Sequence, residues 1–265
     1  MTRRLCLITG ASSGIGSAFA KVYARQGYDV ALTARRADRL EALADTLRLR
    51  YAVETLVLPG DLADPATPDR LLAEIAAHGR QVDALVNNAG YVLKGPFGQP
   101  AWTEHQAFLQ VMVTGLCALT HGALPGMVER RFGRIVNVAS VAGLVPASPG
   151  QTLYGAAKAF VIKFSQSLNV EYRTRGVHVT ALCPGLTYSE FHDVSGTREQ
   201  VAEAPPWVWM GPDEVAEAGY EAVEANRAVS VPGAPNKALA AAAKLLPDEW
   251  GLAVIAHERG RFGLR

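Results

Sequence analysis

A tyrosine and a lysine four residues apart could carry acid–base chemistry. Tyr154 and Lys158 stand at positions i and i+4, so they share one face if this segment is helical. A phenol with the ordinary pKa of about 10 is neutral at pH 7, and a neighbouring ammonium would lower that pKa. Such a tyrosine could exchange a proton with a carbonyl or alcohol oxygen. The alternative is an ordinary pair on a solvated helix surface.

A serine hydroxyl favours the catalytic interpretation. Ser140 directly follows the apolar run 134–139, which we predict to be a buried strand. Sheets of α/β proteins bind their ligands at the carboxyl ends of the parallel strands. A hydroxyl at this point could polarise the same substrate oxygen that Tyr154 would protonate.

A glycine-rich segment near the start of the chain could hold a pyrophosphate. Residues 9–16, with the spacing Gly-x-x-x-Gly-x-Gly, follow a predicted strand and open a predicted helix. Glycines permit a tight turn and a close backbone approach, and the free N–H groups of a helix N-terminus favour negative charge. This context predicts a dinucleotide-binding loop rather than an ordinary glycine-rich turn. Its predicted cofactor contacts are Gly10, Ser12, Ser13, Gly14, Ile15 and Gly16.

Two arginines at the end of the second predicted strand indicate which dinucleotide binds. A carboxylate there would bond the ribose hydroxyls of NAD, but the sequence has Arg35 and Arg36 and no acid. A guanidinium can hold a 2′-phosphate through two hydrogen bonds. We therefore predict NADP(H), bound first by Arg35 and second by Arg36. The alternative is that both arginines are solvated loop charges.

The elements that must position these residues alternate between strands and helices. The predicted strands cover residues 5–8, 30–33, 53–58, 84–86, 134–139, 177–182 and 229–231. The predicted helices cover residues 14–26, 39–49, 68–77, 103–130, 153–174, 214–224 and 238–246. We expect Pro125 to bend the long helix. The pattern predicts a single α/β domain over residues 1–265, a Rossmann-type doubly wound sheet of about seven parallel strands.

Composition excludes several classes of protein. The 265 residues are 49% hydrophobic and 19% charged, which excludes a disordered chain. Lys+Arg number 26 and Asp+Glu 25, so no basic surplus predicts a nucleic-acid partner. The apolar runs are short and interrupted, which predicts no membrane span and no secretory signal. Three widely spaced cysteines predict buried thiols in a cytoplasmic protein, and no residue set has the spacing of a catalytic metal site.

The motifs together resemble those of the short-chain dehydrogenase/reductase family. The resemblance runs from about residue 5 to residue 190, and more weakly to Gly233. It rests on the glycine loop, Asp61-Leu62, Asn87-Asn88-Ala89-Gly90, Ser140, Tyr154 with Lys158, and Pro184-Gly185. It implies that Tyr154 is the acid/base, that Lys158 binds the nicotinamide ribose and lowers the tyrosine pKa, and that Ser140 orients the substrate oxygen. It also implies a homodimer or homotetramer formed through long helices.

Further cofactor contacts are implied by the same resemblance. Asp61 and Leu62 would flank the adenine. Asn87, Ala89 and Gly90 would line the cofactor ribose, and Thr187 and Ser189, after Pro184 and Gly185, would hold the nicotinamide carboxamide. Met112 departs from the family pattern, because many members have an Asn there that supports a water in the proton relay. A thioether cannot donate a hydrogen bond, so a backbone carbonyl with a water, or Thr114, would have to take the place of that Asn, or the proton supply would be poorer. The alternative interpretation is that Met112 only fills the hydrophobic core.

The segment after Pro184-Gly185 would cover the site as a lid, over residues 186–212. Its bulky apolar and aromatic residues predict an apolar or aromatic substrate, unless they pack against the body or another subunit. The candidate substrate contacts are Leu144, Val145, Phe191, His192, Trp207 and Trp209. The tail over residues 234–265 would dock on the subunit or on a neighbour.

The predicted function is NADP(H)-dependent interconversion of a ketone or aldehyde with the corresponding alcohol. The partner would be a small carbonyl or alcohol substrate, with no nucleic acid and no membrane. One alternative within the family is reduction of a C=N or C=C bond, which the fold does not exclude. Another is a non-enzymatic NADP(H)-binding sensor or partner protein, which only Met112 supports.

Overall fold

Seven parallel strands form one sheet in the order β3-β2-β1-β4-β5-β6-β7. The computed structural model describes residues 3–147, 149–191, 195 and 204–257. The strands are β1 Leu5–Thr9, β2 Asp29–Thr33, β3 Thr55–Val57, β4 Val82–Asn87, β5 Gly133–Val138, β6 Val177–Leu182 and β7 Val229–Ser230. All residues of β1 and β2 are buried, as expected for strands covered on both faces. The predicted doubly wound sheet is confirmed.

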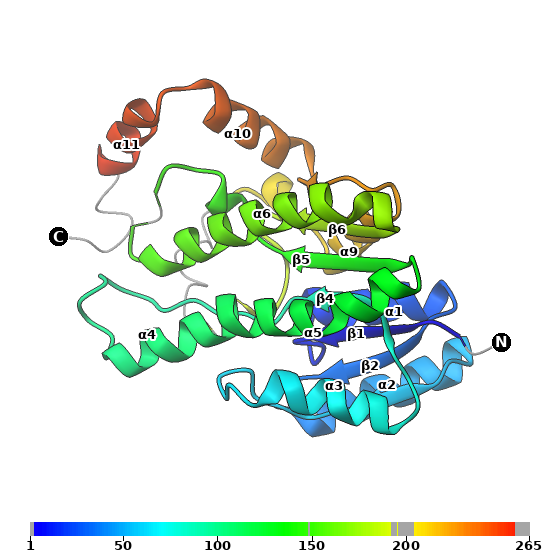
Figure 1. The fold of residues 1–265 in the computed structure, drawn as a ribbon. Coiled ribbons are helices and arrows are strands. Elements are labelled where there is room, and N and C mark those ends of the chain that lie inside the picture. The colour runs from blue at the N-terminus through cyan, green and yellow to red at the C-terminus, as the bar shows by residue number, and fades with distance from the viewer. Residues whose placement is uncertain (1–2, 148, 192–194, 196–203, 258–265) are drawn as a thin grey trace.

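Helices cover both faces of this sheet (Figure 1). The helices are α1 Gly14–Arg25, α2 Ala37–Tyr51, α3 Thr67–Ala77, α4 Trp102–Leu109, α5 Gly115–Glu129, α6 Thr152–Tyr172, α9 Pro212–Glu224, α10 Ala234–Leu245 and α11 Asp248–His257. One hydrophobic core joins α1, α2 and α9 to the sheet, and a second joins α3, α5 and α6. The chain runs outward from β1 to β3 and then returns to β4 beside β1, so the strand order reverses between β1 and β4. Ligands bind at such a switch point in this class of sheet.

The long helix predicted over residues 103–130 contains an irregular turn. Residues Gln110–Thr114 form a π-helical turn between α4 and α5, and the N–H of Gly115 bonds the carbonyl of Gln110 five residues back. Pro125 lies inside α5, which continues to Glu129. The stretch Trp102–Glu129 is long and apolar enough to cross a membrane by length and composition alone. Here it packs against α3 and β4, and this position in the fold accounts for its apolar face.

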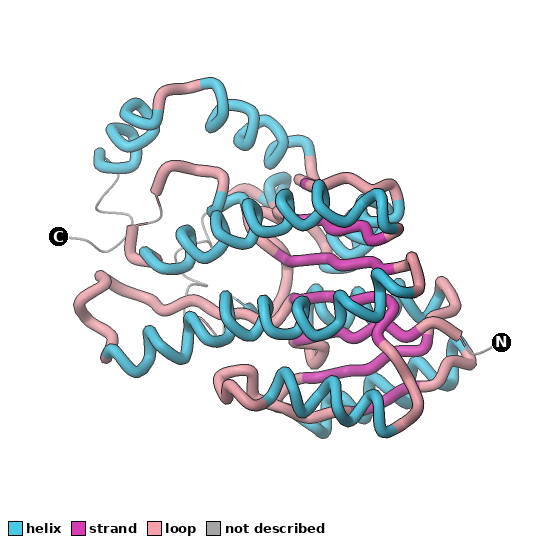
Figure 2. The backbone as a smooth tube through the Cα atoms, in the orientation of Figure 1, coloured by secondary structure: helices cyan, strands magenta, loops and turns pink. Residues whose placement is uncertain are grey.

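The C-terminal helices α10 and α11 extend beyond the sheet, as the tube drawing shows (Figure 2). Asn236 of α10 lies against Gly185, and Gly251 of α11 lies against the ring of Pro146. The tail therefore contacts the loops at the carboxyl ends of β5 and β6. All three cysteines are free thiols; Cys6 and Cys183 are buried and Cys117 is partly buried.

Candidate active site

The glycine loop joins the carboxyl end of β1 to the start of α1. Gly10 and Gly14 have φ angles of 65° and 54°, in the region that favours glycine. A Cβ atom on Gly16 would lie 2.2 Å from the carbonyl oxygen of Gly10, so no larger residue fits there. The first turn of α1 has no acidic side chain, which leaves the positive end of the helix open to an anion. The loop therefore has the backbone and the charge that a pyrophosphate requires.

Hydrogen bonds fasten this loop to the loop that follows β4. The Thr9 hydroxyl accepts the N–H groups of Asn88 at 2.9 Å and Ala89 at 3.0 Å. The Asn88 amide in turn donates to the carbonyl of Thr9 at 2.9 Å. The two loops on either side of the switch point are therefore held in one fixed relation.

The side chain of Asn87, which the family motif assigns to the cofactor ribose, makes its hydrogen bonds inside the fold. Its amide donates to Asn137 at 2.9 Å and to Thr120 at 3.1 Å, and Asn137 continues the chain to Ser165 at 2.9 Å. All four side chains are buried. Asn87 thus connects β4 to β5 and α5 through its amide N–H groups, while its Oδ1 atom is buried without a hydrogen-bond partner.

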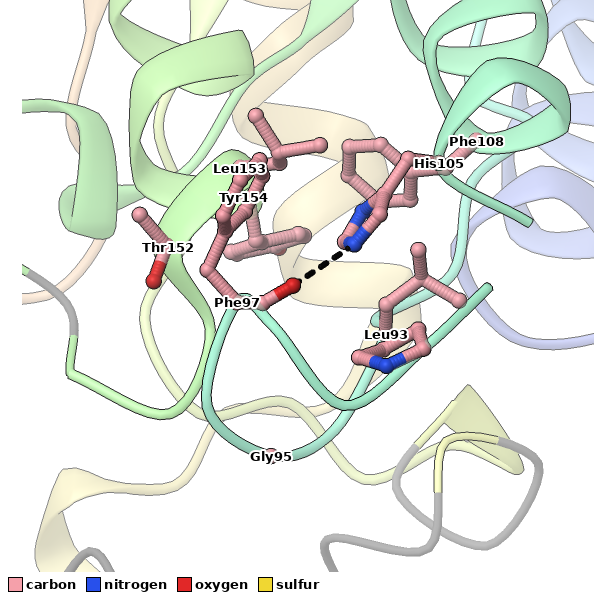
Figure 3. A pocket seen from close by; sticks show the side chains of 9 residues that line it. Leu93, Gly95, Phe97, His105, Phe108, Thr152, Leu153 and Tyr154 are labelled. Atoms are coloured by element: carbon pink, nitrogen blue, oxygen red, sulfur yellow. Dashed lines mark hydrogen bonds between the residues drawn. The ribbon is translucent and has the colours of Figure 1, made fainter. Parts of the chain in front are cut away.

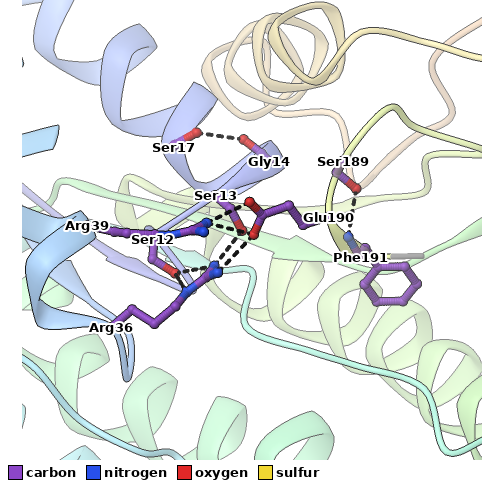
Figure 4. A network of polar contacts seen from close by, with 9 residues as sticks. All are labelled: Ser12, Ser13, Gly14, Ser17, Arg36, Arg39, Ser189, Glu190 and Phe191. Carbon is purple, nitrogen blue, oxygen red and sulfur yellow. Dashed lines mark hydrogen bonds and ion pairs between the residues drawn. The ribbon is translucent and has the colours of Figure 1, made fainter. Parts of the chain in front are cut away.

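Arg36, rather than Arg35, contacts the glycine loop (Figure 4). One guanidinium nitrogen of Arg36 donates to the hydroxyls of Ser12 at 3.0 Å and Ser13 at 3.1 Å. The side chain of Arg35 is exposed. Two charged residues that sequence reasoning missed complete this group, because Glu190 of the lid pairs with both Arg36 and Arg39.

The predicted catalytic residues come together at the carboxyl end of β5. Ser140 lies two residues after the end of β5, and its hydroxyl is near enough to Tyr154, the third residue of α6, to lower the pKa of that phenol. Lys158 lies one turn further along α6, is 6% exposed, and donates to the carbonyl of Val138 at 2.7 Å. A hydroxyl, a phenol and an ammonium therefore face the same edge of the sheet as the glycine loop.

Burial shifts the pKa values of this group. Burial raises the pKa of Tyr154 to about 12, and the hydrogen bond from Ser140 offsets only part of that rise. Burial also lowers the pKa of Lys158 to about 8. The direction for Tyr154 is opposite to the expected one, because desolvation outweighs any effect of Lys158. The ammonium nitrogen lies 5.5 Å from the centre of the tyrosine ring and bonds Val138 instead.

The other residues assigned to the adenine and ribose lie nearby but differ in exposure. Asp61 is exposed and accepts the N–H of Ala63 at 3.0 Å, whereas Leu62 is buried in the core. Gly90 is exposed, and a Cβ atom there would lie 2.9 Å from the sulfur of Met112. Met112 is buried against Phe108 and Ala157. Met112 therefore has the position of a residue that fills the hydrophobic core.

The lid begins directly after β6 and Pro184-Gly185. Thr187 forms a parallel bridge with Met210, and the N–H of Tyr188 bonds the carbonyl of Met210 at 3.0 Å. Ser189 reaches back to the glycine loop, because a Cβ atom on Gly14 would lie 2.9 Å from the Ser189 Cβ. The residues assigned to the nicotinamide end thus lie beside the predicted pyrophosphate loop.

A narrow pocket opens beside the catalytic tyrosine (Figure 3). Its lining residues are Leu93, Gly95, Phe97, Pro100, His105, Phe108, Thr152, Leu153 and Tyr154. His105 is buried, stacks on Phe97 with ring centres 4.7 Å apart, and bonds the Phe97 carbonyl through Nε2 at 2.9 Å. Sequence reasoning missed this wall. Ligands bind at the carboxyl ends of parallel strands, and this rule, which identified Ser140, also predicts that the loop after β4 contributes to the site.

The predicted substrate contacts are distributed unequally around Tyr154. The ring of Phe191 lies 5.9 Å from the ring of Tyr154, and Leu144 packs partly into the core. Val145 is partly buried in the loop after β5. The ring of Trp209 stacks on the ring of Tyr188 with centres 4.9 Å apart, and Trp207 is 70% exposed. His192 lies outside the described residues.

No group of three or more His, Cys, Asp or Glu side chains could hold a metal ion within the part of the chain that the structure describes.

Comparisons with known proteins match most of the chain. A family model described as short chain dehydrogenase matches residues 4–200. Sulfoacetaldehyde reductase 2 of Chromohalobacter salexigens is 39% identical over 203 residues, 75% of this chain and 78% of that protein. A short-chain dehydrogenase from Sphingobium yanoikuyae, solved in complex with NADPH, is 32% identical with a TM-score of 0.80, covering 99% of this chain and 96% of that one. A bulky-bulky ketone specific alcohol dehydrogenase from Comamonas testosteroni is 27% identical with a TM-score of 0.76, covering 100% and 96%.

Proposed function

The chain belongs to the short-chain dehydrogenase/reductase family, and from this premise we propose that it interconverts a carbonyl and an alcohol on an apolar or aromatic small molecule. The observation that carries the proposal is the contact between Ser140 and Tyr154, with Lys158 buried one turn behind. These three groups lie at the same sheet edge as the glycine loop. The solved relative in complex with NADPH supports NADP(H) as the cofactor.

The residues present fit this dinucleotide. The glycine loop and the start of α1 would hold the pyrophosphate, because the backbone is open there and the helix end is positive. Arg36, with Arg35 beside it, would bind the 2′-phosphate through charge-assisted hydrogen bonds. Thr187 and Ser189 would hold the nicotinamide carboxamide. When bound, the cofactor supplies or accepts the hydride.

The chain's own residues would manage the proton. In reduction, the neutral phenol of Tyr154 donates its proton to the carbonyl oxygen, and Ser140 hydrogen-bonds the same oxygen. The phenolate that forms would be stabilised by the ammonium of Lys158. In oxidation the same groups would work in reverse. The high pKa of Tyr154 keeps it in the acid form throughout the neutral range, which suits reduction.

The pocket beside Tyr154 supports an apolar substrate. Leu93, Phe97, Phe108 and Leu153 are apolar residues among those that line it. None of the lining residues in the described part of the chain is Arg or Lys, so the wall offers no partner for a strongly anionic substrate. The ketone-specific solved relative points the same way.

Tyr154→Phe tests the chemistry. This variant should bind NADPH as the parent protein does, because the hydroxyl does not hold the fold, yet it should lose nearly all turnover. NADPH consumption is followed at the nicotinamide absorbance with a panel of aromatic and aliphatic ketones. Retained turnover would sink the assignment of Tyr154. If the unmodified protein binds NADPH but turns over no carbonyl, imine or alkene substrate, the sensor alternative gains instead.

Arg36→Ala tests the cofactor. A lost charge-assisted contact to a phosphate should weaken NADPH binding by about tenfold or more while changing NADH binding little. Titration of the intrinsic protein fluorescence with each nucleotide gives both dissociation constants. Equal losses for the two nucleotides would remove the claim that Arg36 reads the 2′-phosphate. The same titration on Arg35→Ala measures how much the exposed Arg35 contributes to NADPH binding.

We further propose that the protein is a homodimer or homotetramer. The outer face of α6 supports association, since Val170 is 67% exposed and Phe160 is 42% exposed on it. Apolar side chains of this size gain free energy when they are removed from water.

A further inference from the structure

A carboxylate of the lid occupies the arginines beside the glycine loop (Figure 4). Arg36 donates to one oxygen of Glu190 at 2.9 Å, and Arg39 donates to both of its oxygens at 2.6 and 2.8 Å. The hydrogen bonds from Arg39 and Arg36 lower the pKa of the Glu190 carboxyl, so it is ionised at neutral pH. Two guanidinium groups on one carboxylate form an anion site that the chain fills with its own anion.

The same site is the one that a 2′-phosphate needs. Arg36 holds Glu190 with one nitrogen and the hydroxyls of Ser12 and Ser13 with another. It therefore joins the lid directly to the loop proposed to bind the dinucleotide. A second anion brought to Arg36 would lie close to the Glu190 carboxylate, and like charges at short range repel. The carboxylate and a phosphate cannot both keep this position.

The contact is weak enough to be exchanged. Arg36, Arg39 and Glu190 are 39%, 43% and 41% exposed in their side chains, and exposed ion pairs of this kind contribute little to stability. A phosphate monoester carries a charge of about −1.5 to −2 near pH 7 and three acceptor oxygens, against −1 and two for a carboxylate. A 2′-phosphate is thus the stronger ligand for the two arginines, whereas the 2′-hydroxyl of NAD(H) has no charge to compete with.

Glu190 also stands between two other contacts of the lid. Its neighbour Ser189 lies against Gly14 of the glycine loop, and its other neighbour Phe191 has its ring 5.9 Å from that of Tyr154. Three consecutive residues therefore contact the pyrophosphate loop, the arginine pair and the catalytic tyrosine. If Glu190 loses its arginine partners, the contacts of Ser189 and Phe191 on either side of it can change as well.

We propose that Glu190 is an internal competitor for the 2′-phosphate of the cofactor, and that it makes the segment of residues 189–191 respond to the phosphorylated dinucleotide. This inference rests on the proposed function. The dianion displaces the carboxylate from Arg36 and Arg39, while a nucleotide without the phosphate leaves Glu190 in place. Glu190 is accordingly a specificity-determining residue that lowers the affinity for every ligand which must displace it.

Equilibrium binding to Glu190→Gln tests the proposal without relying on turnover. The variant keeps the size and hydrogen-bonding capacity of the side chain and removes its charge. Calorimetric titrations use NADPH, NADH, adenosine 2′,5′-bisphosphate and adenosine 5′-monophosphate; the last two lack the nicotinamide, so they isolate the 2′-phosphate. Glu217→Gln is the matched control, since Glu217 is a similarly exposed carboxylate paired with Arg25 away from the site.

We expect Glu190→Gln to bind NADPH and adenosine 2′,5′-bisphosphate about twofold to fivefold more tightly, the range that an exposed ion pair can withhold. NADH and adenosine 5′-monophosphate should not bind more tightly, and Glu217→Gln should resemble the parent protein. Unchanged affinity for the bisphosphate would overturn the proposal. Weaker binding would also overturn it, because Glu190 would then clasp the bound cofactor rather than compete with it. Equal tightening of all four ligands would show only a general effect of charge.

Arg36→Ala separates failure of this inference from failure of the proposed function. If Arg36→Ala weakens NADPH selectively while Glu190→Gln does not tighten it, the cofactor assignment stands and the competition does not exist. If Arg36→Ala leaves NADPH affinity unchanged, the assignment of the 2′-phosphate site itself is wrong.

Discussion

At the scale of single residues, the reactivity of Tyr154 depends on a balance between burial and charge. Burial, which the interaction with Ser140 offsets only in part, raises its pKa to about 12 and makes the phenol a weak acid. Donating its proton creates a phenolate in a poorly solvated place, and the ammonium nitrogen of Lys158 lies 5.5 Å from the centre of the ring. The charge on Lys158 therefore matters most when the proton moves. That charge is itself easily lost, because burial lowers the lysine pKa to about 8.

Carbonyl reduction should consequently slow as the pH rises through about 8. Lys158 carries its proton below its pKa and loses it above, so above about pH 8 the forming phenolate loses its stabilising charge. Tyr154 does not titrate until about 12 and stays protonated meanwhile. Measuring kcat for reduction from pH 6 to 10 at saturating substrate and NADPH should show a single fall. A flat profile to pH 10 would contradict this role, and Lys158→Arg, whose charge persists, should move the fall to higher pH if it folds.

Sequence patterns identified those residues whose position follows from local geometry. Ser140 was found because it ends a strand, and Tyr154 and Lys158 because their spacing matches a helical turn. The hydrogen bond from Asn87 to Asn137 was not predicted, because a motif at a strand end does not say which neighbouring strand its side chain contacts. Glu190 was missed, since its contacts with Arg36 and Arg39 span more than 150 residues and arise only from the tertiary fold.

At the scale of elements, the catalytic geometry depends on how closely the turn after β5 approaches α6. This turn, Val141–Gly143, begins directly after Ser140. A Cβ atom on Gly143 would lie 2.5 Å from the carbonyl carbon of Lys158 and 2.6 Å from the nitrogen of Ala159. Because both are backbone atoms of α6, neither can yield without moving the helix. Gly143 thus sets the distance between the serine and the tyrosine.

Gly143→Ala should separate the turn from α6 and lower kcat by roughly tenfold or more, as expected for small misplacements of reacting groups. NADPH affinity should change little, since the glycine loop lies on a different strand. Steady-state kinetics and a nucleotide titration measure the two effects. Gly98→Ala is the matched control, because a Cβ atom there meets nothing within 4 Å. A normal kcat in Gly143→Ala would show that the turn can shift without cost to catalysis.

The element boundaries show where periodicity is informative and where it is not. The strands were predicted to within a few residues because buried parallel strands are apolar without interruption. The π-helical turn at Gln110–Thr114 was not predicted, since one additional residue in a turn barely alters the apolar pattern of a long helix. The sequence instead predicted a bend at Pro125, and in the structure α5 continues past this residue to Glu129.

At the scale of the whole molecule, α6 carries both the proposed catalytic residues and the proposed surface for association. Its inner face carries Tyr154 and Lys158, and its outer face exposes Phe160 and Val170. Phe160 stacks on Phe164 with ring centres 5.7 Å apart, which makes this outer face partly rigid as well as apolar. If a second copy covers this surface, the helix that holds the catalytic pair is supported from both sides.

Val170→Glu should therefore lower the molecular mass in solution. A charge placed on an apolar interface must be buried without a partner or must prevent contact, and the second outcome costs less free energy. Sedimentation velocity should show the parent protein as a dimer or tetramer and the variant in a smaller state. Leu49→Glu is the matched control, because Leu49 of α2 is even more exposed, at 91%, but lies away from α6. A parent protein that sediments as a monomer, or a variant of unchanged mass, would show that α6 is not the interface. If Val170→Glu has both a lower mass in solution and a lower activity, and Leu49→Glu has neither, association supports the catalytic helix.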